Sequence, residues 1–274
     1  MILQTFHRKL FLLSLVVALG GCETVQTTQG GVVGIQREQR MAVSSAAMNQ
    51  SAQTQYAELM AAERQKGTLN RQATQTARVR TIADRLVAQT SVFRPDARSW
   101  KWEVNVISSP EVNAWCMPGG KIAVYTGLIE KLQVTDDELA AVMGHEIAHA
   151  LREHARERAS EQAVAGLGIS VLSAALGAGD LGQKGMEYAY MGLLGLPNSR
   201  AHETEADRMG VELAARAGYN PEAAISLWQK MGQVGAGEPP KFLSTHPSRS
   251  DRMRDLGDYA QRVAPLYQQA RQRP

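Results

Sequence analysis

The sequence of 274 residues contains only two cysteines, Cys22 and Cys116. This number is too small for a fold held together by several disulfides, so a disulfide framework is excluded even in an oxidising compartment. Long apolar stretches are also lacking. The two most apolar segments, residues 10–19 and 163–178, are too short to cross a bilayer as a helix, and the second is also rich in glycine.

The sequence has no concentration of positive charge. Its formal net charge is +3 at pH 7, and loss of residues 1–21, which contain Arg8 and Lys9 and no acidic residue, would reduce this to 3 − 2 = +1. No basic cluster remains, so nucleic acid is excluded as a partner despite a pI of 8.9. The remaining 274 − 21 = 253 residues can bury one core, and no internal repeat divides them.

Residues 145–149 have the sequence HEIAH, which fits the pattern H-E-x-x-H. Residues four apart lie on one face of a helix, so His145 and His149 can bind one metal ion. Glu146 lies beside the first ligand, where its carboxylate can take a proton from a water molecule that the metal activates. A capping box that begins at Thr135 predicts a helix around the motif. The pattern therefore favours zinc over two ordinary helix histidines.

A catalytic zinc ion needs a third protein ligand and one open position. Residues 199–218 are predicted to form a second helix, in which Glu203 and Asp207 are four residues apart. Glu203 is the candidate third ligand. Asp207 can accept a hydrogen bond from the ring nitrogen of a ligand histidine that does not bind the metal. Glu205 lies about 200° around the helix from Glu203 and should face away from zinc. His202 is a weaker alternative for the third ligand, because it has no partner at that spacing.

Four motifs in this sequence resemble those of peptidase family M48, a family of zinc metallopeptidases in the gluzincin group. In chain order they are N-A-x-x-x-P-G-G at 113–120, H-E-x-x-H at 145–149, E-x-x-A-D at 203–207 and T-H-P-x-x-x-x-R at 245–252. The resemblance implies one Zn²⁺ per chain, held by His145, His149 and Glu203. It also implies that Glu146 is the catalytic base and that Asp207 supports a ligand.

The segment around Pro118 is predicted to be a hairpin. Pro118 cannot donate to a strand ladder, which places it at an edge or a turn. We expect an edge strand along the cleft that binds extended peptide through backbone hydrogen bonds. A buried core hairpin is the alternative. The candidate substrate-binding residues are Asn113, Ala114, Gly119, Gly120 and Arg252.

His246 is a second catalytic candidate, with two open alternatives. It can stabilise the negative charge that develops on the carbonyl oxygen, or it can bind zinc as an inhibitory fourth ligand. A structural role at the Pro247 turn is a third possibility. Residues 163–196 also allow two interpretations, a core helix or a mobile cover near the active site.

The N-terminus is typical of a bacterial lipoprotein. Arg8 and Lys9 precede a short apolar run, and two glycines lead directly to Cys22. This pattern predicts a signal peptide at 1–21 and lipidation of Cys22, whereas an ordinary signal peptide is the alternative. Glu23 in the next position favours the outer membrane, so we expect an anchored protein that faces the periplasm of a Gram-negative bacterium.

The predicted fold class is α+β, mostly helical and zincin-like, with one small sheet or hairpin at the edge of the active site. Residues 22–35 are expected to form a membrane tether, and residues 36–274 one peptidase domain with N-terminal helices. Helices are predicted at 36–64, 69–89, after Pro221 and from about Ser248, and a strand at 102–107.

The expected function is that of a zinc metalloendopeptidase that cuts unfolded or misassembled envelope proteins. The alternative is a non-catalytic lipoprotein that serves as a chaperone or an assembly scaffold. Glu146 favours the protease, because a scaffold needs no general base. The outer-membrane assembly machinery is a candidate partner in either case.

Overall fold

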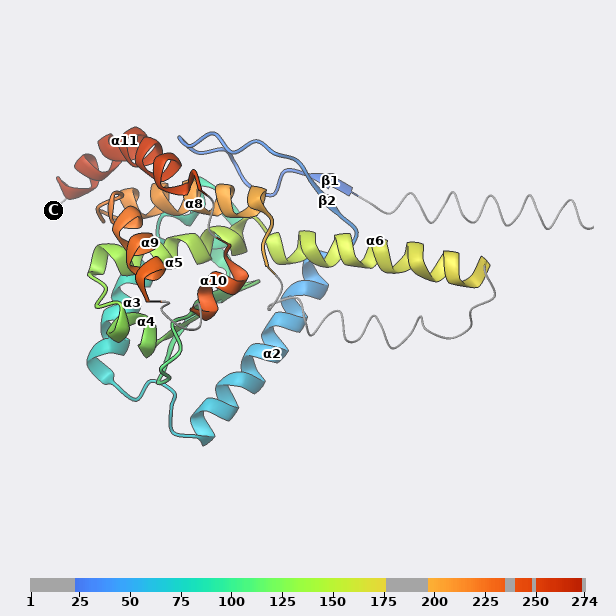
Figure 1. Cartoon of the computed structure of the whole chain (residues 1–274), viewed down its shortest axis with the longest axis horizontal. Helices are drawn as coiled ribbons and strands as arrows, with labels where there is room; N and C mark the ends of the chain where they lie inside the picture. The colour runs from blue at the N-terminus through green and yellow to red at the C-terminus, as the bar shows by residue number, and fades with distance from the viewer. Residues whose placement is uncertain (1–22, 176–196, 235–239, 248–249, 273–274) are drawn as a thin grey trace, which may run out of the picture.

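The computed structural model describes residues 23–175, 197–234, 240–247 and 250–272 (Figure 1). Its helices are α2 Ser45–Gln65, α3 Ala73–Val87, α4 Thr126–Lys131, α5 Asp136–Leu151, α6 His154–Ala175, α8 Arg200–Arg216, α9 Ala223–Gln233, α10 Lys241–Thr245 and α11 Arg252–Arg271, with short 3-10 turns at Thr90–Val92 and Pro95–Ser99. The strands are β1 Glu23–Val25, β2 Gln39–Met41, β3 Glu103–Ile107, β4 Ala114–Met117 and β5 Lys121–Tyr125. This composition confirms the predicted α+β class, mostly helical with small sheets.

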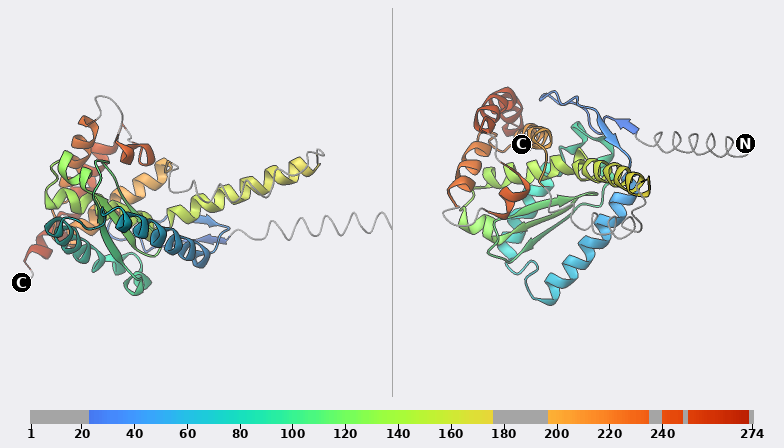
Figure 2. Two further views of the ribbon diagram at one scale, coloured as in Figure 1. Left: turned by 90° about the horizontal axis from the view of Figure 1, so that it is seen from below. Right: turned by 45° about the vertical axis from the view of Figure 1, so that its right-hand side comes forward.

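Helix α5 lies at the centre of the domain, with α3, α8 and α9 packed around it and β4 along another side (Figures 1 and 2). Its start is fixed by the predicted capping box. The Thr135 hydroxyl accepts from the Glu138 backbone N–H at 3.2 Å, and the Glu138 carboxylate accepts from the Thr135 N–H at 2.8 Å. Every residue from Leu139 to Leu151 is buried, so the H-E-x-x-H motif lies on the most enclosed helix of the domain.

Helices α5 and α8 cross at a pair of glycines. A Cβ added at Gly210 would lie 2.7 Å from the His145 backbone nitrogen, and one added at Gly144 would lie 2.9 Å from the Gly210 carbonyl oxygen. Both distances are shorter than real Cβ contacts, so only glycine allows the two backbones to approach so closely. The crossing brings the helix with both histidines against the helix with Glu203.

The three-stranded sheet has the order β3–β5–β4, with β5 parallel to β3 and antiparallel to β4. The predicted hairpin is present, and β4 lies at the edge of the sheet. Its turn requires glycine, because Gly119 and Gly120 have φ angles of +78° and +82°. A Cβ at Gly120 would also meet the Trp102 ring at 2.7 Å.

The N-terminal segment differs from its prediction. β1 pairs with β2 in an antiparallel ribbon, and Val33 and Ile35 belong to the main core, so the residues that could act as a free tether are fewer than 22–35. The helix predicted at 36–64 begins only at Ser45, after a cap by Ser44. In β2 the exposed Arg40 lies between the buried Gln39 and Met41, and this alternation is typical of a strand.

Helix α6 extends away from the body of the domain (Figure 2). Val164 is 46% exposed, so the start of the apolar segment 163–178 is not in the core as one of its two interpretations required. Residues 176–196, on which the cover interpretation depends, lie outside the described residues. No helix among the described residues is long and apolar enough to cross a membrane. The last helix begins at Arg252 rather than at Ser248.

We expect Gly210→Ala to destabilise the domain by about 1–3 kcal/mol, because the added methyl group overlaps the backbone of α5. The melting temperature should fall by roughly 2–12 °C. Gly232→Ala is the matched control, since Gly232 is also helical and a Cβ there meets nothing within 4 Å. Equal melting temperatures for the two variants would contradict the importance of the crossing.

Candidate metal centre

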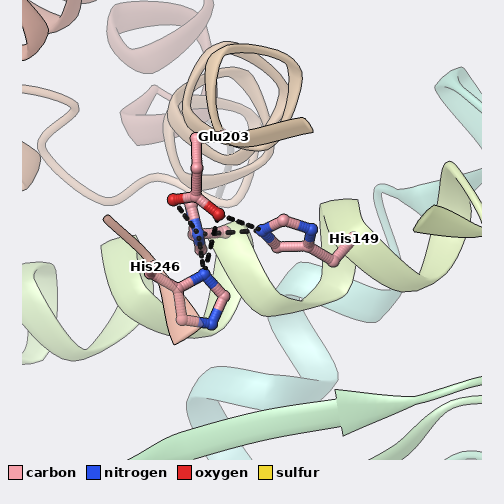
Figure 3. A group of neighbouring side chains, drawn as sticks. His149, Glu203 and His246 are labelled. Atoms are coloured by element: carbon pink, nitrogen blue, oxygen red, sulfur yellow. Dashed lines mark hydrogen bonds and ion pairs between the residues drawn. The ribbon is translucent and has the colours of Figure 1, made fainter. Parts of the chain in front are cut away.

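Four side chains from three segments converge on one point. α5 contributes His145 and His149, α8 contributes Glu203, and His246 follows directly after α10. One potential ligand atom from each lies within 4.8 Å of all the others, and all four side chains are buried. Figure 3 shows the carboxylate of Glu203 directed toward the imidazoles of His149 and His246.

The spacing of these atoms fits a zinc ion. His145 Nε2 lies 3.0 Å from His149 Nε2 and 3.6 Å from Glu203 Oε2, and His149 Nε2 lies 3.4 Å from Glu203 Oε1. His246 Nδ1 lies 3.2 Å from His145 Nε2 and 3.0 Å from Glu203 Oε1. A tetrahedron with zinc–ligand bonds of roughly 2.0–2.1 Å has edges of about 3.3 Å. The residues present therefore fit zinc in both geometry and donor type.

The carboxylate of Asp207 determines which nitrogen of His145 faces this point. Asp207 Oδ1 lies 3.0 Å from His145 Nδ1 and also accepts from Arg252 Nη2 at 2.6 Å. An ionised carboxylate can only accept, so Nδ1 of His145 carries the proton and Nε2 presents its lone pair to the ligand group. The sequence predicted that Asp207 would hold a ligand histidine, and the structure brings the two side chains together in this way.

Arg252 was expected to bind substrate, and the structure contradicts this. Its side chain is fully buried, with its guanidinium 3.2 Å from the centre of the Trp228 ring. It donates to Glu203 Oε2 at 3.1 Å and to Asp207 Oδ1, and it does not line the cleft. Arg252 therefore holds the two carboxylates of α8 in place.

Glu146 lies between the ligand group and the cleft. Its side chain is buried, and burial raises its pKa, which suits a general base. A backbone hydrogen bond from Cys116 on β4 holds the carboxylate. Oε1 lies 3.3 Å from His246 Nε2 but has no hydrogen-bond partner among the described residues. Glu146 also lines the cleft, so its carboxylate can accept a proton from a molecule bound there.

His246 occupies the fourth corner of the ligand group through Nδ1, while Nε2 faces Glu146. Burial alone would lower the pKa of His246, but the carboxylates of Glu146 and Glu203 raise it above its usual value. The ring stacks on Phe242 with centroids 4.3 Å apart. Nδ1 therefore lies within reach of a metal ion bound by the group, and Nε2 lies beside Glu146.

The cleft next to the ligand group has a volume of about 400 Å³. Its walls come from β4, α5, the start of α6 and the segment around His246. Asn113 and Ala114, two of the predicted substrate-binding residues, line it. Gly119 and Gly120 do not line it, because they form the turn at the far end of β4. The edge strand therefore runs along the cleft as expected, while these two glycines serve the hairpin.

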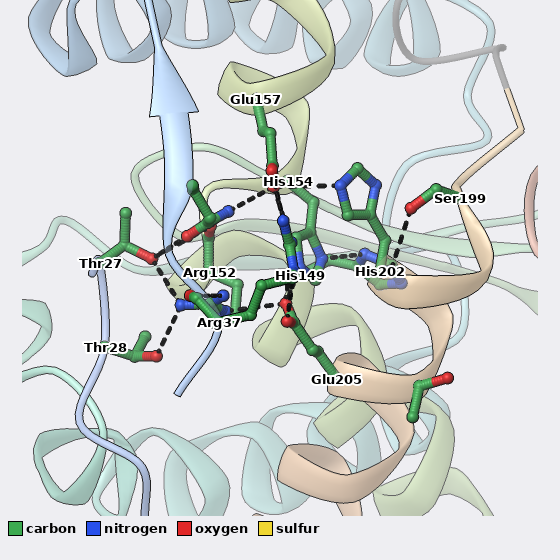
Figure 4. Close-up of polar contacts among 12 residues, drawn as sticks. Thr27, Thr28, Arg37, His149, Arg152, His154, Glu157, Ser199, His202 and Glu205 are labelled. Carbon is green, nitrogen blue, oxygen red and sulfur yellow. Dashed lines mark hydrogen bonds and ion pairs between the residues drawn. The ribbon is translucent and has the colours of Figure 1, made fainter. Parts of the chain in front are cut away.

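Sequence reasoning assigned no role to His154, which lies five residues after His149. His154 offers no atom to the ligand group, but its Nδ1 lies 2.8 Å from Nδ1 of His149 (Figure 4). Burial lowers the pKa of both rings well below the usual value. Glu205 does face away from the ligand group, toward His154, and His202 lies with its Nε2 3.0 Å from Glu157 Oε2 instead of joining the ligands. Cys22 lies outside the described residues.

Comparison with known proteins gives consistent matches. The profile of peptidase family M48 matches residues 73–260. The mitochondrial metalloendopeptidase OMA1 of Schizosaccharomyces pombe is 38% identical over 164 residues, which cover 58% of this chain and 47% of that protein. The OMA1 protein of Arabidopsis thaliana is 38% identical over 155 residues, or 57% of this chain and 31% of that protein. The β-barrel assembly-enhancing protease of Yersinia pestis is 28% identical over 198 residues, or 68% and 39%. The chain thus spans about a third to a half of these relatives.

We expect the purified protein to bind about one zinc ion per chain and His149→Ala and Glu203→Ala to lose it, because each removes one corner of the ligand set. Metal content measured by mass spectrometry after dialysis tests this. His202→Asn is the control, since it removes an equally buried histidine that lies outside the ligand group. Full zinc occupancy in both ligand variants would contradict the assignment.

Proposed function

Because the chain belongs to peptidase family M48, we propose that it is a zinc-dependent metalloendopeptidase that hydrolyses unfolded or misassembled proteins of the bacterial envelope. The observation that carries the activity is the position of Glu146. It is adjacent to a four-residue ligand group that fits zinc, and its side chain lines a cleft bordered by an edge strand.

Each residue of the centre has a role in peptide hydrolysis under this proposal. Zinc held by His145, His149 and Glu203 would act as a Lewis acid and lower the pKa of water. Glu146 accepts the proton from the attacking water and returns it to the leaving amine. Asp207 fixes the orientation of His145.

The edge strand supports a preference for extended chains. A peptide that lies beside β4 can form backbone hydrogen bonds whose strength depends little on side-chain identity. Unfolded segments offer such backbone, whereas folded domains do not. This selectivity suits a protease that removes faulty envelope proteins, and the name of the Yersinia pestis relative, β-barrel assembly-enhancing protease, is consistent with a substrate or partner in outer-membrane assembly.

We place the protein at the periplasmic face of the outer membrane, anchored through lipidated Cys22. The support is the sequence pattern of residues 1–23 together with the bacterial relatives. The OMA1 relatives are mitochondrial, so the family itself occurs in more than one compartment.

Glu146→Gln should keep zinc and the fold but lose peptidase activity by at least about 10²-fold, because an amide cannot accept the proton. Cleavage of casein and zinc content, measured on the same preparation, test this. Undiminished cleavage would reject the mechanism. If Glu146→Gln also restored full function in cells that lack the protein, the chaperone or scaffold alternative would replace the protease.

His246→Ala should raise casein cleavage several-fold while zinc remains bound, because it frees the fourth position of the ligand group. Initial rates at saturating substrate distinguish the two roles of His246. A fall in the catalytic rate instead would show that His246 stabilises the oxyanion and is not an inhibitory ligand.

Cys22→Ala should release the protein from the membrane fraction or leave it as an unprocessed precursor, because several acyl chains on one cysteine provide the anchor. Mass spectrometry of the mature N-terminus, with cell fractionation, tests this. An unmodified Cys22 in protein that is still bound to the outer membrane would contradict the lipoprotein assignment.

A further inference from the structure

A second buried polar cluster lies behind the metal centre, on the side of His149 that faces away from the ligand group (Figure 4). It combines side chains of α6 and α8 with two arginines. Its members are Arg37, Gln39, Arg152, His154, Glu157, His202 and Glu205. Arg37 and Gln39 come from the N-terminal segment, which lies outside residues 73–260 that match the family.

This cluster does not have the character of a second metal site, although His154, Glu157 and His202 are close enough to share an ion. The oxygens of Glu157 already accept from Arg37 at 2.5 and 2.9 Å and from Gln39 at 2.6 Å. A guanidinium thus supplies the positive charge that the carboxylate needs. Among the side chains of this cluster that the structure describes, His154 is the one that contacts a residue of the ligand group.

The contacts of His154 determine the tautomer of His149. Glu205 accepts from Arg152 Nε at 3.0 Å and from Arg37 Nε at 2.6 Å, so its carboxylate is ionised. His154 Nε2, 3.0 Å from Glu205 Oε2, must therefore carry the proton. A ring that donates through Nε2 can accept through Nδ1, and the group that faces this Nδ1 among the described residues is Nδ1 of His149, 2.8 Å away. His149 consequently presents its Nε2 lone pair to the ligand group.

We propose that His154 is a positioning residue for the metal ligand His149, and that Arg37 of the N-terminal segment completes this support by fixing Glu205. The proposal rests on the zinc site of the proposed function. Asp207 contacts Nδ1 of His145 directly, whereas Nδ1 of His149 contacts the imidazole of His154, which in turn contacts the carboxylate of Glu205. The metal centre then depends on residues that precede the family match.

The test is zinc affinity of the full-length protein, measured by competition with a chelator. His154→Ala should weaken binding about 10–100-fold, the usual effect of removing a partner of a ligand histidine. His154→Asn should restore part of this loss, because its amide oxygen can accept from His149 Nδ1. His202→Asn is the matched control. Its ring stacks on His154 with centroids 4.3 Å apart and is equally buried, but it touches no ligand.

A spectroscopic readout separates positioning from general stability. The visible bands of the cobalt-substituted protein should change in His154→Asn and stay as in wild type in His202→Asn, because only the first alters the orientation of a ligand. Melting temperatures of the metal-free proteins should fall by similar amounts in both. If His154→Ala does not fold, the comparison is made between His154→Asn and His202→Asn. Unchanged zinc affinity in the His154 variants, or equal losses in His202→Asn, would overturn the proposal.

The role of Arg37 is tested by a double-mutant cycle. Arg37→Gln should weaken zinc binding several-fold in the wild-type background and have little further effect in His154→Asn, because both act through the same contact. Full additivity would show that Arg37 does not act through His154 and would overturn that half of the proposal. Absence of zinc binding by the wild-type protein would instead reject the metal site itself, and with it the proposed function.

Discussion

The crossing of α5 and α8 at Gly144 and Gly210 is the contact on which the rest of the centre depends. Two helices with side chains at the crossing stand 8–10 Å apart as a rule, whereas a glycine pair lets the backbones touch. The carboxylate of Glu203 must reach the imidazoles of α5 from the neighbouring helix. Gly144 directly precedes His145, and Gly210 lies about two turns after Glu203 on α8. The close approach of the helices at these glycines makes that reach possible, so backbone packing rather than any side-chain bond sets the size of the metal site.

Charge balance explains how so many polar groups remain buried. Arg252 neutralises the carboxylates of Glu203 and Asp207 on one side of the centre, and Arg152 lies against Glu205 on the other. An unpaired carboxylate in this environment would cost several kcal/mol. Each guanidinium is itself packed, as the stacking of Arg252 on Trp228 shows. The ligands are thus held by charge-assisted hydrogen bonds on both sides, which orients them in advance of metal binding.

Local periodicity reveals the parts of the centre that lie on a single helix. The spacing of four residues located His145 with His149 and Glu203 with Asp207, and the capping pattern located the start of α5. The spacing does not indicate the contact of His154 with His149, because α5 ends at Leu151 and the chain turns at Glu153 with a φ of +52°. A projection that assumes a continuous helix therefore does not show that His154 reaches Nδ1 of His149. The contacts of Arg37 and Arg252 are long-range, and no local pattern encodes them.

The hydrogen bonds around the centre differ between the residues that would bind the metal and the residue that would transfer a proton. Asp207 and His154 each use a polar atom to fix one ligand histidine. Glu146, the proposed general base, is different: its side chain lines the cleft, and one of its oxygens has no hydrogen bond among the described residues. A fully bonded carboxylate would be a weak base, since its lone pairs would already be occupied. Hydrogen bonds therefore fix the ligand histidines, which need a defined orientation. Glu146 keeps an oxygen that can still accept a proton.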